Sequence, residues 1–358
     1  MVITILSTIF VLGVLIFIHE LGHFLVAKRV GIKVERFSLG FPPNIFNKTV
    51  GDTTYTIGAI PLGGYVKMAG ENPDDAVKGD PNEFMSKSPM QRAAVILAGP
   101  FMNYLLAIAI LIGVFYFGGK PVYDESQVLI GALVDDGPAK AAGLQDDDQV
   151  IAVDGLPVTE ISALTEHIQK IVEKPVELTI VRGTDTSTVA VTTALREQTS
   201  EDGKVDSLGM IGVYFVPRVV GSEDYGFLES VSAGFISAHV IVYRTGEFVK
   251  QLVFGEVSTK LIGGPLFIAQ QSGREARKGA DSLFTFMALL SINLAVLNVL
   301  PIPILDGGHL VFLAIEVIKG SPVSMKARMI AQQVGMLALL SLILFVTYND
   351  VMRVLGRL

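Results

Sequence analysis

Four long apolar stretches constrain the fold of this 358-residue chain more than any other feature, and three of them have no charged residue over residues 93–119, 282–305 and 329–349. A helix needs about 20 consecutive apolar residues to cross a bilayer. The stretches predict transmembrane helices over residues 1–30, 93–119, 282–306 and 329–350. Half of the residues are hydrophobic and the mean hydropathy is +0.53, which is too apolar for an ordinary soluble protein. We therefore predict a multi-pass α-helical membrane protein.

The first stretch contains an HExxH motif at a depth where polar side chains are costly. Between residues 1 and 27 the only formally charged side chain is Glu20, and an ionisable group inside a bilayer costs roughly 2.5 kcal/mol or more. His19 and His23 are four residues apart, so on a helix both can offer imidazole nitrogens to one Zn²⁺. Glu20 would then lie beside the metal, placed to take a proton from bound water. The alternative, two histidines that are merely satisfied within a helix bundle, leaves the buried carboxylate unexplained.

A second polar interruption of apolar sequence predicts the third ligand that a catalytic zinc needs. Asp306 lies in the segment NVLPIPILDGGH, residues 298–309. The two prolines stop the third helix, so this span is expected to break before it exits. Gly307 and Gly308 are expected to let the turned chain approach the metal closely. Alone, the segment could be a helix-ending turn at the membrane surface, but together with HExxH it predicts a His₂Asp site with a fourth position for water.

Residues 31–92 predict a membrane-associated β region. Residues 34–39 and 53–57 alternate in hydrophobicity and are separated by the turn-forming pairs Pro42-Pro43 and Gly51-Asp52. The segment is unusually apolar for a loop. A β-hairpin that dips into the membrane beside the metal, with its backbone shielded by protein, would use that composition. The alternative is an ordinary cytoplasmic hairpin.

Residues 120–220 predict a separate α+β domain, inserted between the second and third transmembrane helices. Strand-like runs at residues 128–134, 149–153, 176–181 and 188–193 accompany one amphipathic helix over residues 161–172. The segments 137–144 and 148–155 resemble the PDZ domains attached to bacterial envelope proteases. A PDZ groove binds a peptide by adding a strand to its sheet and seating the C-terminal carboxylate on loop amides. The run Asp146-Asp147-Asp148 lacks the spacing of a calcium loop and predicts a solvated turn.

Two further segments lie outside the predicted spans and the inserted domain. Residues 221–281 carry apolar residues at helical spacing, which predicts amphipathic helices along the membrane surface. Residues 307–328 are expected to be a connecting segment.

The distribution of basic residues predicts the orientation in the membrane. Basic residues flank residues 31–92, so the positive-inside rule puts that segment in the cytoplasm and the inserted domain outside. The basic residues before the third span, Arg274, Arg277 and Lys278, count against this orientation. The net charge of −7 argues against a nucleic-acid partner, and the absence of cysteine excludes disulfides and thiolate ligands.

The motifs, taken in order, resemble the site-2 protease family of intramembrane zinc metalloproteases, in its bacterial RseP-type branch with a PDZ domain. The resemblance covers nearly the whole chain and is carried by HELGH at 19–23, FSLGF at 37–41, PLGGYVKM at 61–68, GPFMN at 99–103, the PDZ-like block, Gly264-Pro265 and NxxPxPxxDGG. It implies that His19, His23 and Asp306 bind Zn²⁺ and that Glu20 is the catalytic base. His309, three residues beyond Asp306, is expected to be structural and not a fourth ligand.

The resemblance also implies how a substrate is handled. Asn293 and Asn298 match paired asparagines implicated in substrate handling, and residues 63–68, which include Gly63, Gly64 and Tyr65, would supply a membrane-associated β edge. Substrates would be transmembrane segments of single-span proteins, such as anti-sigma factors already trimmed outside a bacterial inner membrane, or remnant signal peptides. The PDZ domain, on the extracytoplasmic side, would read peptide C-termini or exclude bulky ectodomains.

Two other functions fit parts of the pattern. A metal-binding membrane scaffold could recruit partners through its PDZ domain without catalysis, and it would be indifferent to replacement of Glu20. A transporter would also place polar groups in a broken span, but the second half of the chain does not repeat the first.

Overall fold

The computed structural model describes residues 1–71, 79–134, 137–199, 205–255 and 262–355, which belong to two compact units. One unit is Met1–Gly118 together with Tyr225–Leu358, and the other is the inserted segment Gly119–Asp224. Each unit has its own buried hydrophobic core. The inserted domain therefore folds around a core that is separate from that of the helices.

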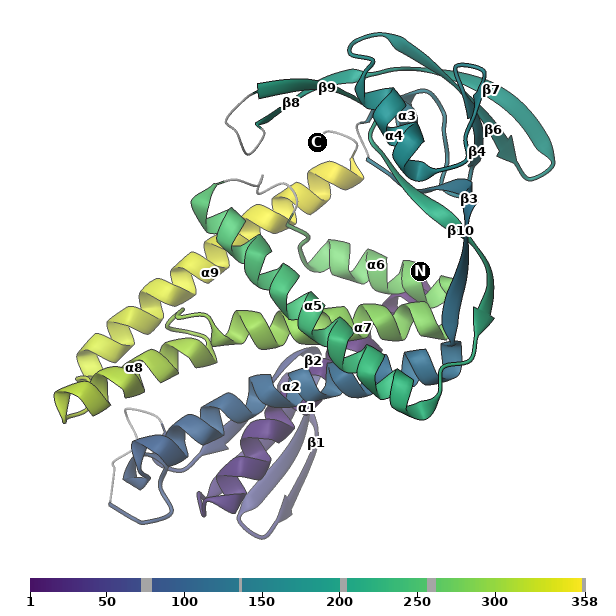
Figure 1. Ribbon diagram of the computed structural model, residues 1–358. Helices are drawn as coiled ribbons and strands as arrows, with labels where there is room; N and C mark the ends of the chain where they lie inside the picture. Colours follow the sequence, from purple (N-terminus) through teal and green to yellow (C-terminus); the bar gives the residue numbers. More distant parts are fainter. Residues whose placement is uncertain (72–78, 135–136, 200–204, 256–261, 356–358) are drawn as a thin grey trace. The chain divides into compact units, whose positions relative to one another are not determined.

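The first unit contains the helices that are predicted to cross the membrane (Figure 1). Among the described residues, four helices are long and apolar enough to do so: Val2–Arg29 (α1), Pro89–Gly118 (α2), Ala280–Val299 (α7) and Lys326–Val354, which is most of α9 (Met325–Val354). Helices α5 (Phe227–Phe254), α6 (Pro265–Lys278) and α8 (Asp306–Lys319) complete the unit. Helix α2 packs against α1, α5, α7 and α8, which places it at the centre. The predicted multi-pass α-helical membrane fold is confirmed.

The predicted connecting segment, residues 307–328, contains a further helix. Helix α7 ends at Val299, the chain turns, and α8 begins at Asp306 and continues to Lys319. The residues after the turn form a helix because α8 has neighbours to pack against, namely α2 and α7. Leu313 of α8 is buried in this packing.

The two glycines after Asp306 lie against the backbone of the turn between α7 and α8. A Cβ on Gly307 would overlap the carbonyl oxygens of Val299 and Leu300, and a Cβ on Gly308 would overlap that of Ile302. The absence of side chains lets α8 fold back closely on the end of α7. This close turn places Asp306 at the start of α8.

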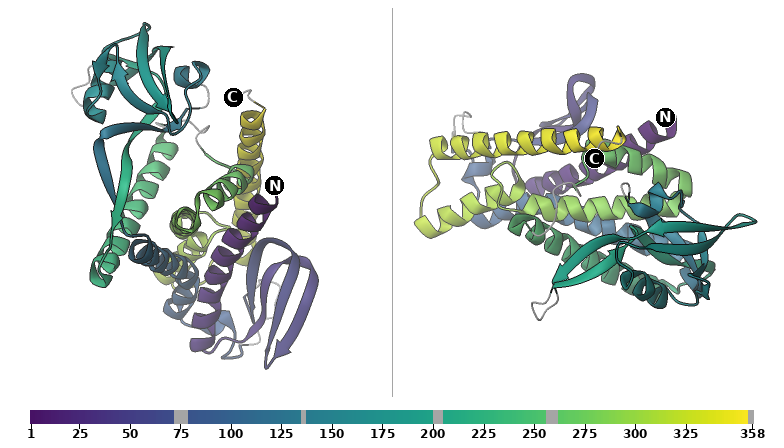
Figure 2. Two further views of the ribbon diagram at one scale, coloured as in Figure 1. Left: turned by 90° about the vertical axis from the view of Figure 1, so that its right-hand side faces the viewer. Right: turned by 90° about the horizontal axis from the view of Figure 1, so that it is seen from above.

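Strands β1 (Val34–Val50) and β2 (Thr53–Met68) form the β region, which lies alongside α1 (Figure 2, left). Both strands are longer than predicted, because Pro42-Pro43 lies inside β1 and the turn comes at Gly51-Asp52. Residues 36–39 of β1 have two sets of partners in β2, residues 54–57 and residues 64–67. Residues 64–67 pair on one side alone, so they lie at an edge of the described sheet. A one-turn helix, Phe84–Ser86 (η1), follows before α2.

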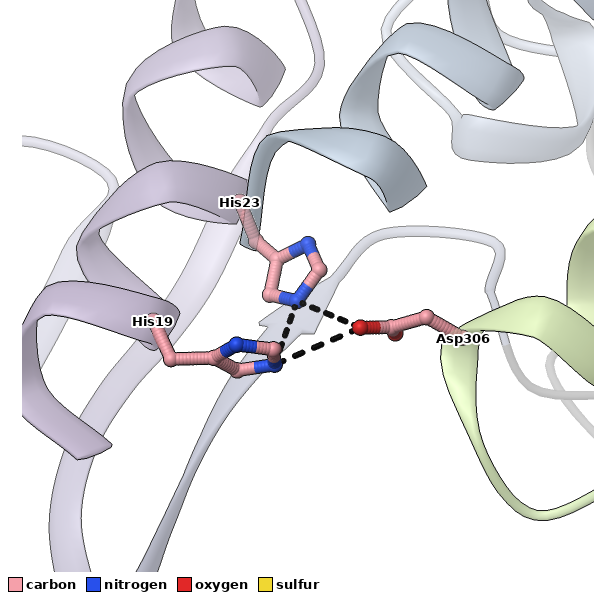
Figure 3. Close-up of side chains that lie close together, drawn as sticks. All are labelled: His19, His23 and Asp306. Carbon is pink, nitrogen blue, oxygen red and sulfur yellow. Dashed lines mark hydrogen bonds and ion pairs between the residues drawn. The ribbon is translucent and has the colours of Figure 1, made fainter. Parts of the chain in front are cut away.

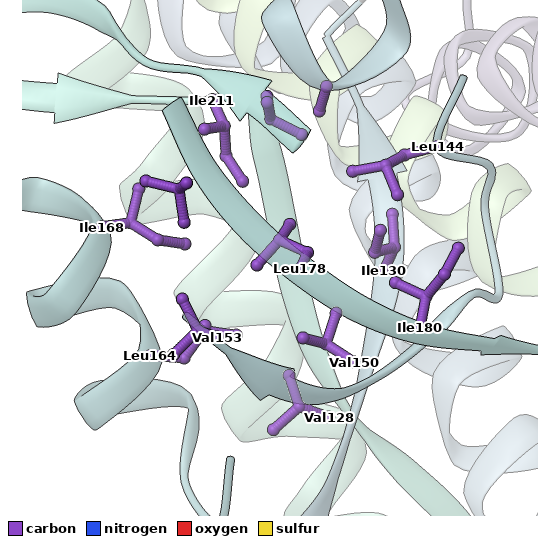
Figure 4. Close-up of a cluster of buried hydrophobic side chains, with 13 residues drawn as sticks. Val128, Ile130, Leu144, Val150, Val153, Leu164, Ile168, Leu178, Ile180 and Ile211 are labelled. Carbon is purple, nitrogen blue, oxygen red and sulfur yellow. The ribbon is translucent and has the colours of Figure 1, made fainter. Parts of the chain in front are cut away.

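The inserted unit is the predicted α+β domain. Its main sheet has the strand order β10-β3-β4-β6-β7, with the short β5 beside β4, and β8 and β9 form a second ribbon. The bounds are Lys120–Leu133 (β3), Gln149–Val153 (β4), Leu156–Pro157 (β5), Pro175–Arg182 (β6), Asp185–Thr192 (β7), Ala194–Thr199 (β8), Val205–Met210 (β9), Val213–Glu223 (β10), Pro138–Ala141 (α3) and Ile161–Gln169 (α4). Buried Val128, Ile130 and Leu178 of the sheet face Leu164 and Ile168 of α4 across the core (Figure 4).

The aspartate run in this domain is not simply a solvated turn. The Asp148 side chain is 1% exposed, and its carboxylate accepts hydrogen bonds from Arg182 Nη2 at 2.6 Å and from the backbone N–H of Gln145 at 2.8 Å. Burial acts to raise the pKa of Asp148, but these donors outweigh it and hold the pKa below its ordinary value. The side chain links the turn before β4 to the end of β6.

Candidate active site

Helix α1 and the first turn of α8 bring together the three side chains that are predicted to bind zinc (Figure 3). Asp306 Oδ2 lies 3.3 Å from His19 Nε2 and 3.6 Å from His23 Nε2. The two Nε2 atoms are 3.2 Å apart. Residues from opposite ends of the chain therefore point at one position between two helices.

The three side chains fit a zinc ion. One ligand atom from each lies within 4.8 Å of the others. Asp306 Oδ2 is buried and has no hydrogen-bond partner among the described residues, which is costly unless a donor or a cation satisfies it. Two imidazole nitrogens and one carboxylate oxygen are a donor set that catalytic zinc accepts, with a position left for water. The chemistry and the convergence of these atoms both favour Zn²⁺.

Glu20 lies in the same cavity as the three predicted ligands. The cavity has a volume of about 250 Å³. Its polar lining includes the three ligands, Glu20, Glu71, His309, Arg328 and Gln332, and its apolar lining includes Met68, Phe84, Met85, Val95, Ile96 and Phe312. His309 lines this space but is not part of the ligand cluster. The site therefore has room for a segment of peptide beside the metal position.

The edge of β2 forms one wall of the cavity. Gly64 and Tyr65 line it, as predicted for a substrate edge, whereas Gly63 packs against the ring of Phe41. A Cβ on Gly64 would lie 3.0 Å from Glu20 Cγ, so glycine lets the strand pass close to the predicted base. The edge of β2 therefore passes next to the predicted base.

The two asparagines predicted to handle substrate are not part of this cavity lining. Asn293 accepts a hydrogen bond of 2.8 Å from the hydroxyl of Thr245 on α5. Asn298 is half-buried one residue before the end of α7. Neither asparagine lines the described cavity, and their role with substrate stays a prediction.

Helix α2 contributes to the site through residues that sequence reasoning did not assign. The carbonyl oxygen of Val95 lies 2.8 Å from His23 Nδ1, and Asn103 Nδ2 lies 3.3 Å from His19 Nδ1. Between them, Gly99 faces both rings, because a Cβ there would overlap His23 Nε2. These positions are four residues apart in an apolar helix. A glycine followed four residues later by an asparagine, within an apolar helix, is the sequence pattern from which these contacts could have been predicted.

A buried ion cluster anchors α8 at its far end. Arg92 of α2 donates from both terminal nitrogens to Glu316 of α8, with 3.1 Å from Nη1 to Oε2. Arg328 Nη2 of α9 lies 3.5 Å from Glu316 Oε2. The three side chains are at most 16% exposed. Because α8 begins with Asp306, this cluster also positions a predicted metal ligand.

Comparison with known proteins decides the family. Residues 7–342 match the model of peptidase family M50. The chain belongs to peptidase family M50. This M50 protein is a zinc metalloprotease of the site-2 protease type, and the predicted resemblance, activity and Zn²⁺ cofactor are confirmed.

Similar proteins cover nearly the whole M50 chain. A protein of Brucella suis biovar 1 (strain 1330), provisionally named a zinc metalloprotease, is 36% identical over 361 residues, which cover 97% of this chain and 94% of that protein. The zinc metalloprotease RasP of Geobacillus kaustophilus (strain HTA426) is 31% identical over 431 residues, which cover 98% of each chain. The solved PDZ domain of an SdrC-like protein of Listeria monocytogenes matches 27% of this chain and 93% of its own, with 21% identity and a TM-score of 0.21.

Proposed function

We propose that this M50 protease cleaves peptide bonds within or beside the transmembrane segments of single-span membrane proteins. The observation that carries the proposal is the location of the candidate site. His19, Glu20 and His23 belong to α1, an apolar helix of 28 residues that is long enough to span a bilayer, and Asp306 follows a second such helix, α7. A hydrolytic site built into such helices is suited to substrates that are themselves in the membrane.

The proposed chemistry assigns one task to each side chain. His19, His23 and Asp306 would hold Zn²⁺, which when bound would polarise the scissile carbonyl and make a water molecule more acidic. Glu20 takes the proton of the attacking water and passes it to the leaving amine, a role typically worth about 10²–10⁴-fold in rate. Its position in the cavity beside the three ligands supports this role.

The β2 edge supports binding of an unwound substrate. A helical substrate hides its carbonyl groups in internal hydrogen bonds, so it must unwind before attack. Residues 64–67 of β2 pair on one side alone, so an added strand could pair with their other side. At the end of this edge the backbone N–H of Met68 donates to Glu71 Oε2 at 3.2 Å. Ile45 and Phe46 elsewhere in the sheet are 73% and 50% exposed, an apolar surface suited to lipid.

Glu20→Gln is expected to leave zinc bound and to reduce cleavage of a model single-span substrate by about 10²–10⁴-fold, because the amide cannot accept the proton. Zinc content and cleavage are measured on the purified chain, with the exposed Glu166→Gln as the matched control. In cells, mass spectrometry of membrane peptides that accumulate with Glu20→Gln identifies the substrates. Trimmed anti-sigma factors and remnant signal peptides are the proposed classes.

The result that contradicts the proposal is a Glu20→Gln protein that cleaves as well as the wild type. A metal-binding scaffold predicts that no membrane peptide accumulates. Accumulation of soluble proteins without transmembrane segments would instead contradict the proposed substrate class.

The inserted domain offers a separate groove, and we propose that it binds peptide C-termini outside a bacterial inner membrane. A cavity of about 160 Å³ lies between α4 and the β9–β10 junction. It is lined by Thr165, Ile168, Gln169, Arg196, Leu208, Gly209, Met210, Ile211, Gly212, Val213 and Phe215. Backbone amides of such a turn suit a terminal carboxylate, and the neighbouring strand suits an added peptide strand.

Sealed vesicles test both the groove and its side of the membrane. A fluorescent peptide with a free C-terminal carboxylate is expected to bind right-side-out vesicles that contain the full chain, and not sealed inside-out vesicles. Binding to inside-out vesicles alone would reverse the proposed orientation. Absence of binding even after detergent opens the vesicles would leave the domain as a size filter.

A further inference from the structure

Helix α2 places a buried amide against one of the predicted zinc ligands. Asn103 is 0% exposed, and its Nδ2 lies 3.3 Å from His19 Nδ1. Its Oδ1 is also buried and has no partner among the described residues. Most buried polar atoms are satisfied, so an unpartnered acceptor beside a metal ligand needs an explanation.

The hydrogen bond that a metal-binding histidine needs explains this unpartnered acceptor. An imidazole that binds a metal through Nε2 carries its proton on Nδ1, and that N–H needs an acceptor. His23 has such an acceptor, because the Val95 carbonyl oxygen lies 2.8 Å from its Nδ1. At Nδ1 of His19, the Asn103 amide is the hydrogen-bonding group that the structure describes.

The orientation of the amide decides which nitrogen of His19 is free for the metal. An amide that donates from Nδ2 to the ring forces the imidazole proton onto Nε2, which blocks the metal. A half-turn of the amide exchanges its nitrogen and oxygen. The unpartnered oxygen can therefore take the position next to His19 Nδ1 without movement of the helix.

We propose that Asn103 is a positioning residue that accepts the Nδ1–H of His19 and thereby directs the Nε2 lone pair to zinc. This rests on the proposed assignment of His19 as a ligand. Val95 and Asn103 are two turns apart on α2, so one face of this helix serves both histidines. The hydroxyl of Ser291 on α7 donates to the backbone carbonyl of Asn103 at 2.7 Å and fixes this turn.

The test measures zinc affinity of the full chain in detergent, by competition with a chelator, together with thermal melting. Asn103→Leu, which has a similar size and no acceptor, is expected to weaken zinc binding 10–100-fold, roughly the usual effect of removing such a partner. Asn103→Asp is an acceptor alone, so it is expected to retain zinc. Ser291→Ala removes the hydrogen bond to the Asn103 backbone carbonyl but leaves the contact between Asn103 and the His19 ring. It is therefore expected to retain zinc as well.

Several results would overturn the proposal. Wild-type affinity in Asn103→Leu would do so. Loss of zinc in Asn103→Asp equal to that in Asn103→Leu would show that the amide acts as a donor or by packing. An equal loss in Ser291→Ala would assign the effect to the position of α2. If the melting curve shows that Asn103→Leu does not fold, loss of zinc in Asn103→Asp alone overturns the proposal, and zinc retained there supports it.

His19→Ala separates failure of this proposal from failure of the site assignment. If it retains zinc, His19 is not a ligand and both proposals fall. If it loses zinc while Asn103→Leu does not, the failure is confined to Asn103.

Discussion

Gly99→Ala is expected to remove zinc from the protein and, with it, the proteolytic activity. A Cβ at this position would overlap His23 Nε2 and lie 2.8 Å from His19 Cε1. The His23 ring cannot simply turn away, because its Nδ1 bonds to the Val95 carbonyl on the same helix. Since the added atom pushes on two ligands at once, we expect zinc affinity to fall on the order of 100-fold or more.

Gly113→Ala is the matched control, because it adds the same atom to the same helix in open space. Both substitutions stabilise the helix by about 1 kcal/mol through helix propensity. A difference in zinc content between the two variants therefore reports the steric effect at the site. The measurement is zinc per polypeptide after dialysis, with cleavage of the model substrate alongside. Full zinc occupancy in Gly99→Ala would contradict the close packing of Gly99 against the rings of His19 and His23.

Glu316→Gln is expected to destabilise the helical unit by about 3–5 kcal/mol, because it leaves two buried guanidinium groups without their counter-charge. The side chains of Glu316 and Arg92 are 11% and 4% exposed, and Arg328 is 16% exposed. The Nε atom of Arg328 is already without a partner among the described residues. We expect weaker zinc binding as well, since the cluster holds the helix that begins at Asp306. Denaturant titration in mixed micelles measures the unfolding free energy.

Two comparisons give this prediction its controls. Glu247→Gln breaks a pair in which Glu247 and Lys250 are 38% and 60% exposed, and it is expected to cost no more than about 1 kcal/mol. Replacement of Arg92, Glu316 and Arg328 together by Met, Leu and Met is expected to recover most of the loss, because apolar side chains often substitute well for a whole buried ion cluster. A Glu316→Gln protein as stable as the Glu247→Gln protein would contradict the anchoring role.

Local spacing made part of the site predictable. His19 and His23 are four residues apart, and the period of a helix alone puts them on one face. Asp306 could be added because a carboxylate in apolar sequence is costly and therefore informative. The residues that support the ligands were not predictable in this way, since the roles of Val95, Gly99 and Asn103 depend on how closely α2 passes α1.

Helix α8 and the pairing of β1 with β2 also depend on contacts that local sequence patterns do not reveal. Apolar residues after Gly308 fit a loop or a helix until their packing partners are known, and α2 and α7 decide for the helix. The alternation of residues 34–39 and 53–57 predicted strands. It did not predict that residues 64–67 would pair on the other side of β1, or that residues 64–66 would line the cavity. Strand pairing depends on contacts between segments, which a local period does not contain.

By itself, the sequence determined the membrane class and the inserted domain, and it predicted the helix that carries HExxH and the three candidate ligand residues, because hydrophobic length, periodicity and the cost of buried charge are properties of short segments. The tertiary structure decided what turns these residues into a site: the convergence of Asp306 with the histidines, the strand edge beside Glu20 and the face of α2 behind both rings. These depend on distances between helices. Such distances are set by the packing of the whole unit and cannot be derived from the spacing within any one segment.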